Sequence, residues 1–233
     1  MSESYTGSDN LEVMLEARNY NHFLKKLVRD YAHGAETALD FGAGIGTFTE
    51  AIPLTADRIF CVEPDHRAQA ILRSRGYQVA SSIGELGDKS FDYIFTLNVL
   101  EHIENDHQIA KDLFDRLNPG QRILVFVPAF NHLRTSMDEL VGHHRRYTRN
   151  SLKAVLTDAG FTVSEVAYTD FLGYFATWLY RFLDLFKKAP SGTINRPLLI
   201  TYDRMIFPVS RLLSIPFARF IGKNVFAVAE KKL

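Results

Sequence analysis

Short apolar segments alternate with amphipathic segments along residues 37–168 of the chain. The apolar segments are brief and rich in β-branched and aromatic residues, as at 91–97 and 122–127. The segments between them carry apolar residues at helical spacing, as at 151–159. Strands that alternate with helices in this way predict an α/β fold with a mainly parallel sheet and helices on both faces.

Seven segments have the composition of strands. A stretch of more than fifty residues, 171–224, separates the last two, and this is far too long for a hairpin loop. We therefore expect one domain over residues 1–233, with a helical insertion or lid at 171–224 and an N-terminal helix within 10–33. The predicted strands are 37–40, 58–62, 77–81, 91–97, 122–127, 161–168 and 225–230.

The first predicted strand ends at Asp40 and runs into a loop with Gly42, Gly44 and Gly46. Glycines let the backbone turn tightly and let a ligand approach where a side chain would collide. In a doubly wound sheet, ligands bind at the carboxyl ends of the strands. A dinucleotide fingerprint would place its third glycine at position 47, which is Thr47, so the spacing argues against nicotinamide binding.

Glu63 follows the second predicted strand. An acidic residue at this place is expected to hold the two hydroxyl groups of a ribose. The loop and Glu63 together predict a nucleoside-containing ligand, and no lysine follows the glycines as a phosphate-binding P-loop would require.

Three motifs follow the predicted strands in the order and spacing of a known family. They are Asp40-x-Gly42-x-Gly44-x-Gly46, Glu63-Pro-Asp65 and Asn98-Val-Leu-Glu-His-Ile103. With the Asn-Pro-Gly turn before the fifth strand, they resemble motifs of the class I S-adenosylmethionine-dependent methyltransferases. The resemblance implies a Rossmann-like seven-stranded sheet whose last strand, 225–230, is antiparallel.

Two further segments narrow the resemblance to a bacterial subgroup, the methyltransferase type 11/12/23-like proteins, which are often encoded beside glycosyltransferase genes. These segments are Arg18-Asn-Tyr-Asn and Asp138-Glu-Leu-Val-Gly-His-His-Arg-Arg-Tyr147. We expect methyl transfer to an oxygen or nitrogen nucleophile on a small acceptor that is anionic, amphipathic, or linked to a lipid or sugar.

The resemblance also implies which residues contact the cofactor, S-adenosyl-L-methionine, whose product is S-adenosyl-L-homocysteine. The glycine loop would pass under the methionine part, and Asn98 would face the methyl group. At the adenine the family often has an aspartate where this chain has Ser82. The implied cofactor-binding residues are Tyr20, Asp40, Gly42, Gly44, Gly46, Glu63, Asp65, Ser82 and Asn98.

Methyl transfer requires alignment of the acceptor and, for a hydroxyl or amine, removal of a proton. His143 and His102 are the candidate bases, and Tyr147 is a third candidate catalytic residue. Arg145 and Arg146 could bind an anionic acceptor. The alternative for His102 is a residue in the first turn of a helix, satisfied by the backbone or by a carboxylate. The alternatives for the segment after the fifth strand are a solvated basic loop that caps the helix at Ser151, or an internal ion-pair network with Asp138 and Glu139. The histidine spacings show no metal motif, so we expect no metal.

The zero net charge of the chain is an average over two unlike parts. Residues 171–223 contain eight basic and two acidic residues, and seven of the sixteen residues at 171–186 are aromatic. This insertion could lie on a membrane surface, cover an apolar acceptor, form a dimer contact, or simply pack on the sheet. We expect a protein that binds no nucleic acid and that is cytoplasmic, either free or peripheral at the inner membrane face.

Two other functions remain open from the sequence. One is a nicotinamide-dependent oxidoreductase, and the other is a module that binds S-adenosylmethionine without catalysis. The acceptor and the oligomeric state do not follow from the residues.

Overall fold

The computed structural model describes residues 13–184 and 195–233. The start of the predicted N-terminal helix, at residues 10–12, lies outside these ranges, as does the Lys187–Lys188 pair of the insertion.

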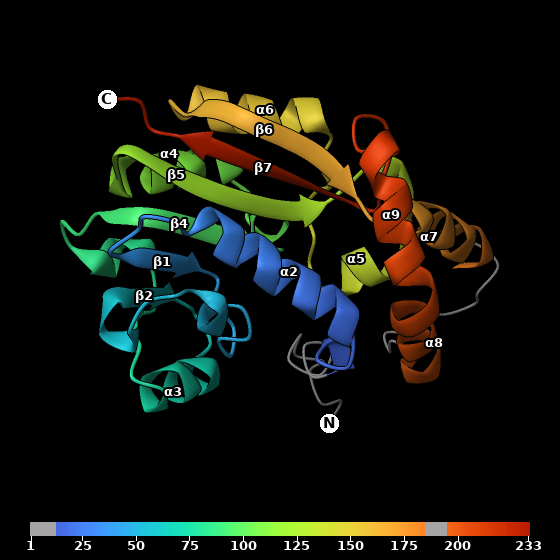
Figure 1. The fold of residues 1–233 in the computed structure, drawn as a ribbon, viewed down its shortest axis with the longest axis horizontal. Helices are drawn as coiled ribbons and strands as arrows, with labels where there is room; N and C mark the ends of the chain where they lie inside the picture. Colours follow the sequence, from blue (N-terminus) through green and yellow to red (C-terminus); the bar gives the residue numbers. More distant parts are fainter. Residues whose placement is uncertain (1–12, 185–194) are drawn as a thin grey trace.

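The described strands form a single seven-stranded sheet with the order β3-β2-β1-β4-β5-β7-β6 (Figure 1). β7 is antiparallel to both of its neighbours, β5 and β6, while the first five strands pair in parallel. The predicted fold class is confirmed. The strands are β1 (Ala38–Phe41), β2 (Ile59–Val62), β3 (Gln78–Ala80), β4 (Phe91–Leu97), β5 (Leu117–Pro128), β6 (Thr162–Thr169) and β7 (Asn224–Glu230).

Helices cover both faces of the sheet because the strand residues alternate between two buried clusters. Leu39 and Ile94 point to the face covered by α4 (Asp106–Arg116) and α6 (Arg149–Asp158). Their neighbours Ala38 and Phe95 point to the opposite face. That face is covered by α2 (Arg18–Tyr31) and α3 (His66–Ser74), as Figure 1 shows for α2.

The segment behind the glycine loop forms very little helix. Only a single 3-10 turn, η1 (Thr49–Ala51), forms there. Pro53 follows directly and disfavours helical backbone at the preceding residue, and Ile52 is accordingly extended. Further 3-10 turns are η2 (Ala56–Arg58), η3 (Ile83–Leu86), η4 (Leu100–His102) and η5 (Asn131–Leu133).

The described part of the insertion between β6 and β7 is helical. It lies beyond the carboxyl ends of the strands, near the short helix α5 (Ser136–Leu140) (Figure 1). Asp170 holds the helices of the insertion together, because its Oδ1 accepts hydrogen bonds from Tyr202 at 2.5 Å and from Ser210 at 2.7 Å. The φ of Asp170 is positive, at 60°. The helices are α7 (Phe171–Asp184), α8 (Arg196–Thr201), the π-helix η6 (Tyr202–Ile206) and α9 (Phe207–Phe217).

The strand order reverses between β1 and β4, since the chain continues from β1 to β2 and β3 on one side and returns to β4 on the other. In open α/β sheets, ligands bind outside the carboxyl ends of the strands at such a reversal, which here lies between β1 and β4. None of the described helices is long and apolar enough to cross a membrane.

Candidate functional site

The glycine loop follows β1 and lies at the strand reversal. Gly42, Gly44 and Gly46 all have positive φ, +83°, +52° and +84°. A Cβ at Gly42 would overlap the Val99 side chain, and one at Gly46 would lie 2.9 Å from Leu72 Cδ2. A Cβ at Gly44 would meet no described atom within 4 Å. Gly42 and Gly46 are therefore needed for packing, while Gly44 is on the open side of the loop.

Asp40 lies at the end of β1 and is 3% exposed. Its Oδ2 accepts a hydrogen bond from Thr49 Oγ1 at 2.6 Å, which ties the strand to the turn behind the loop. Burial raises the pKa of Asp40 to about 7, and this effect exceeds the lowering due to the Thr49 hydrogen bond. A cation placed beside this carboxyl group would stabilise its ionised form.

Glu63 follows β2 and holds the glycine loop through its side chain. Oε2 accepts a hydrogen bond from the Gly44 amide at 2.7 Å, and Oε1 accepts one from the Asp65 amide at 2.9 Å. Each carboxylate oxygen can accept a second hydrogen bond, so capacity for ligand hydroxyl groups remains. Asp65 itself caps α3, because its Oδ1 accepts from the Arg67 amide at 2.7 Å.

Ser82 is exposed just after β3, at the start of η3. Its neighbour Ser81 accepts a hydrogen bond from Gln69 Nε2 at 3.1 Å, and Gln69 also donates to the Glu63 carbonyl at 2.7 Å. The ends of β2 and β3 are thereby held together. Ser82 lies beside them with its surface open.

Asn98 follows β4 and has a positive φ of 55°, an unusual backbone conformation for a residue other than glycine. Its amide donates to the Phe126 carbonyl at 2.7 Å. Tyr20 of α2 lies near the Asn98 side chain and near Glu101, whose charge acts on the Tyr20 hydroxyl. Two of the predicted cofactor-binding residues, Tyr20 and Asn98, are thus brought together from distant parts of the chain.

These residues fit a nucleoside linked to an amino acid. Gly44 exposes backbone without a side chain, and the Glu63 carboxylate beside it can accept further hydrogen bonds. Asp40 is a buried carboxyl group without a paired cation in the described chain. An ammonium group would complement Asp40, and ribose hydroxyl groups would complement Glu63.

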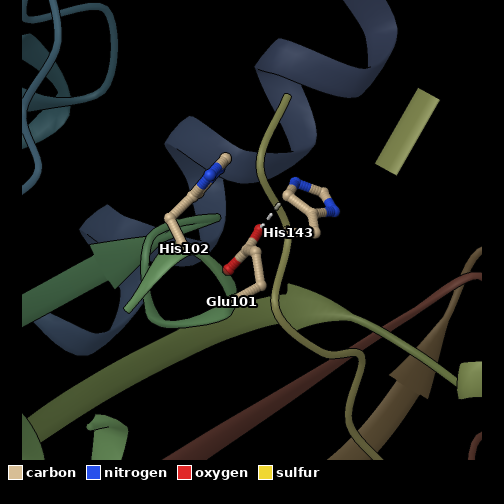
Figure 2. A group of neighbouring side chains, drawn as sticks. All are labelled: Glu101, His102 and His143. Carbon is tan, nitrogen blue, oxygen red and sulfur yellow. Dashed lines mark ion pairs between the residues drawn. The ribbon is translucent and has the colours of Figure 1, made fainter. Parts of the chain in front are cut away.

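A second group of side chains lies next to Asn98. Glu101 and His102 belong to η4, and His143 comes from the loop after α5 (Figure 2). His143 Nε2 lies 4.0 Å from Glu101 Oε1, and the rings of His102 and His143 have centroids 4.5 Å apart. The structure thus joins the two candidate bases in one cluster, and it adds Glu101 to them.

Glu101 is completely buried, and neither of its carboxylate oxygens has a hydrogen-bond partner among the described residues. Burial raises its pKa to about 8, and this effect exceeds the lowering due to a backbone hydrogen bond and to the charge of Arg146. Partial desolvation and the neighbouring His143 lower the pKa of His102 to about 4, so its ring is neutral at pH 7.

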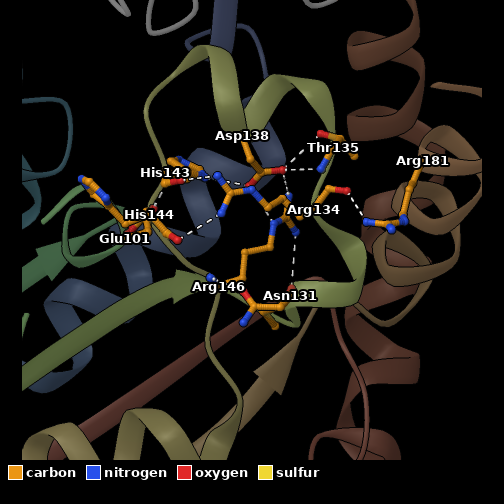
Figure 3. Close-up of polar contacts among 10 residues, drawn as sticks. Glu101, Asn131, Arg134, Thr135, Asp138, His143, His144, Arg146 and Arg181 are labelled. Atoms are coloured by element: carbon orange, nitrogen blue, oxygen red, sulfur yellow. Dashed lines mark hydrogen bonds and ion pairs between the residues drawn. The ribbon is translucent and has the colours of Figure 1, made fainter. Parts of the chain in front are cut away.

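Asp138 organises the loop that carries His143 (Figure 3). Its Oδ1 lies 2.8 Å from His143 Nδ1, and Arg146 donates to both oxygens, at 2.7 Å from Nε and 2.8 Å from Nη2. The Thr135 amide donates to Oδ2 at 2.8 Å. Desolvation would raise the pKa of Asp138, but its hydrogen bonds to His143 and Arg146 outweigh this and hold the pKa far below its ordinary value.

The other candidates of this loop point into the protein. Tyr147 is 2% exposed, and its hydroxyl donates to Asp106 Oδ2 at 2.7 Å. Arg145 pairs with Asp106, and Arg146 pairs with Asp138. Arg146 is thus part of an internal ion pair, and its partner is Asp138. The structure places Tyr147 and Arg145 around a different carboxylate.

Glu101 and Asp138 were not among the site residues that the sequence suggested. Glu101 directly precedes the candidate His102 in the Asn98–Ile103 motif, and Asp138 is the first residue of the Asp138–Tyr147 segment. Both residues therefore belong to motifs that carry the family resemblance. Neither motif indicated that the carboxylates would converge on His143.

Comparison with known proteins gives a family for the chain. A family model described as a methyltransferase domain matches residues 7–166. No curated protein matches the sequence.

Solved structures share the fold at low sequence identity. A protein from Thermotoga maritima, described as an S-adenosylmethionine-dependent methyltransferase and possible histamine N-methyltransferase, has a TM-score of 0.66 and 17% identity, covering 97% of this chain and 95% of that one. An S-adenosylmethionine-dependent methyltransferase from Archaeoglobus fulgidus has a TM-score of 0.58 and 17% identity, covering 94% and 98%. A phosphoethanolamine N-methyltransferase from Haemonchus contortus has a TM-score of 0.58 and 16% identity, covering 93% and 53%.

Proposed function

The chain belongs to the family of S-adenosylmethionine-dependent methyltransferase domains, and from this we propose that it methylates an oxygen or nitrogen nucleophile of a small acceptor linked to a lipid or sugar. The observation that carries the proposal is the pairing of Gly44 and Glu63 at the strand reversal. The open glycine and the acidic side chain that holds it offer a nucleoside a backbone surface and a hydroxyl acceptor in one place. The family match favours this reaction over the nicotinamide-dependent alternative.

The residues that would hold the cofactor come from four strand ends and α2. Asp40 would bind the ammonium group, Glu63 the ribose, Ser82 would border the adenine, and Asn98 with Tyr20 would enclose the methionine side. When bound, S-adenosylmethionine supplies a methyl group that is already activated by its sulfonium. The chain itself has to position the acceptor and accept its proton.

His143 is the candidate base that the geometry supports best. Asp138 accepts at its Nδ1, so the neutral ring carries its proton there and leaves Nε2 available as an acceptor. Nε2 points toward the Glu101 side of the cluster beside Asn98 (Figure 2). Tyr147 is not part of this proposal, because its hydroxyl is buried against Asp106.

The proposed lipid-linked acceptor rests on the exposed surface of the insertion. Trp178 and Phe182 of α7 stack with ring centroids 6.2 Å apart and remain about half exposed, at 52% and 48%. Large exposed patches of this kind are uncommon on monomeric proteins and mark interaction surfaces. Their exposed apolar neighbours on α7, α8 and α9 are Phe175, Leu179, Leu183, Leu198, Val209, Leu212 and Ile215.

Three exposed arginines accompany this apolar surface and favour a peripheral contact with an anionic membrane: Arg204, Arg211 and Arg219. Aromatic and aliphatic side chains together with cations are typical of helices that lie in a membrane interface. An acceptor that resides in the membrane would reach the site from this side, since the insertion lies beyond the carboxyl ends of the strands (Figure 1).

Transfer of labelled methyl from S-adenosylmethionine to fractionated lipid, saccharide and protein extracts tests the reaction. Histamine and phosphoethanolamine, named for two of the structural neighbours, belong in the same screen. We expect label in a lipid or saccharide fraction. Binding of the cofactor without label in any fraction would favour the non-catalytic module instead.

The cofactor site is tested separately by Gly44→Ala, with Gly34→Ala as its matched control. Both glycines have positive φ, +52° and +80°, and neither Cβ would meet a described atom within 4 Å. Both variants should lose similar stability, about 1 kcal/mol. Only Gly44→Ala should weaken S-adenosylmethionine binding, measured by calorimetry. Equal affinities would remove the loop from the site.

Flotation with liposomes tests the membrane contact. The wild-type protein should float with anionic vesicles and less with neutral ones, and added salt should weaken the binding. The double change Trp178→Ala and Phe182→Ala should reduce flotation, while Ile71→Ala, which removes an exposed apolar side chain from α3, should not. Flotation that is equal in all three proteins would end this assignment.

A further inference from the structure

Glu101, His102 and His143 bring three ligand atoms together at the carboxyl end of β4. One oxygen or nitrogen from each side chain lies within 4.8 Å of the other two (Figure 2). We infer that this cluster is a binding site for one divalent metal ion, with Zn²⁺ as the preferred ion. The sequence had indicated no metal, because its histidine spacings match no metal motif and the cluster forms only in the folded chain.

The donor set suits such an ion. Two imidazole nitrogens and one carboxylate oxygen form the protein part of many catalytic zinc sites, which leave a fourth position open. Bond lengths of about 2.1 Å place the ligand atoms of a tetrahedral site roughly 3.4 Å apart. Glu101 Oε1 and His143 Nε2 are 4.0 Å apart, so a small side-chain rotation brings them into range.

Glu101 is the buried group that most needs a partner. Neither of its oxygens has a hydrogen-bond partner within the described chain, and His143 Nε2 stays 4.0 Å from Oε1. The nearby buried carboxylates have close cations: Asp106 pairs with Arg145, and Asp138 pairs with Arg146. A buried, unpartnered carboxyl group is costly. A metal ion at the cluster would compensate its charge and occupy its oxygens.

His143 is oriented as a metal ligand would be. Its Nδ1 is 2.8 Å from Asp138 Oδ1, which fixes the ring and leaves Nε2 as the free nitrogen. Metal-binding histidines almost always have such a partner on the second nitrogen, because it sets the tautomer and raises the basicity of the ligand. Asp138 is in turn fixed by Arg146 and Thr135 (Figure 3).

His102 completes the set from the open side. Its ring nitrogen lies within 4.8 Å of the ligand atoms of Glu101 and His143. It is exposed, so it can turn toward an arriving ion without disturbing the core.

A role for the ion rests on the proposed function, whereas the binding site itself does not. A metal ion beside Asn98 would bind the hydroxyl of an acceptor and lower its pKa, with the proton released to solvent. His143 would then act as a ligand rather than as a free base. Turnover by metal-free wild-type protein separates the two roles, because a free His143 base needs no ion.

The test is calorimetric titration of chelator-treated full-length protein with Zn²⁺, Mn²⁺ and Mg²⁺, with metal content measured after dialysis. We expect one Zn²⁺ per chain and weaker binding of Mg²⁺. His102→Ala and Glu101→Gln should each weaken Zn²⁺ binding by at least tenfold. His102→Ala is the safer variant for folding because the residue is exposed, and Glu101→Gln preserves the shape of a buried side chain.

His107→Ala is the matched control. His107 lies 3.6 Å from Asp158 in an exposed histidine–carboxylate pair outside the cluster. This variant should bind Zn²⁺ like the wild type. Binding that survives His102→Ala and Glu101→Gln, or is lost in His107→Ala, would overturn the assignment, as would the absence of stoichiometric binding by any of the three ions. Metal binding without methyl transfer would uphold the site and remove the proposed reaction.

Discussion

The Tyr20 amide donates a hydrogen bond of 2.9 Å to Oδ1 of Asp203, which lies in the π-helix of the insertion. The Asn19 amide donates to the other carboxylate oxygen at 3.0 Å. Ala17, the residue before α2, provides no side-chain cap, so Asp203 caps this helix from a distant part of the chain. The insertion is therefore joined to the helix whose Tyr20 contacts Asn98.

Asp203→Ala should lower the free energy of unfolding by about 1–2 kcal/mol, because the amides at the start of α2 lose their acceptor. Asp115→Ala is the control, since Asp115 is exposed and pairs with Lys111 of the same helix; it should change stability by less than about 0.5 kcal/mol. Denaturant titration measures both. Equal stabilities would show that the contact does not stabilise the protein.

Gly42→Ala should be far more damaging than Gly34→Ala. The backbone strain is similar, with φ values of +83° and +80°, but only the Cβ at position 42 would collide, with Val99. We expect a loss of about 1 kcal/mol for Gly34→Ala and clearly more for Gly42→Ala, from added overpacking. Thermal unfolding checks this. Similar losses would mean that Val99 moves aside readily.

Asp40 should make stability depend on pH. Its pKa is about 7 in the folded chain and 3.8 ordinarily, so the folded state favours the protonated form. Its contribution is complete below pH 3.8 and is lost as the pH rises to about 7, at about 1.4 kcal/mol for each pKa unit. The wild type should therefore lose stability relative to Asp40→Asn over this range, in cofactor-free protein. A constant difference would contradict the raised pKa.

Tyr147→Phe should affect stability rather than turnover. Its hydroxyl donates to Asp106 and lies 3.2 Å from the Leu100 carbonyl, both inside the protein. The Asp106 oxygen then has one hydrogen-bond partner fewer, which should lower the free energy of unfolding by about 1–2 kcal/mol. Tyr168→Phe removes the acceptor of the Arg149 amide and serves as a comparison. A large fall in kcat at unchanged stability would restore Tyr147 as a catalytic residue.

The sequence determined the sheet and its ligand loop because their signals are local. Alternating apolar segments predicted the ends of β4, β5 and β7 within one residue, except that β5 begins at Leu117, well before the expected residue 122. The glycines after Asp40 indicated a turn with positive φ independently of the rest of the fold. The predicted parallel sheet then placed the ligand at the carboxyl ends of the strands.

Only the tertiary structure decided which side chains of the loop after β5 face the site. Arg145, Arg146 and Tyr147 are adjacent in the sequence, yet the structure places Tyr147 in the core and pairs each arginine with a different carboxylate. His143 instead meets Glu101, which lies more than forty residues earlier. Residue types indicate what chemistry is available, but contacts between distant segments arise from packing, and no local pattern records them.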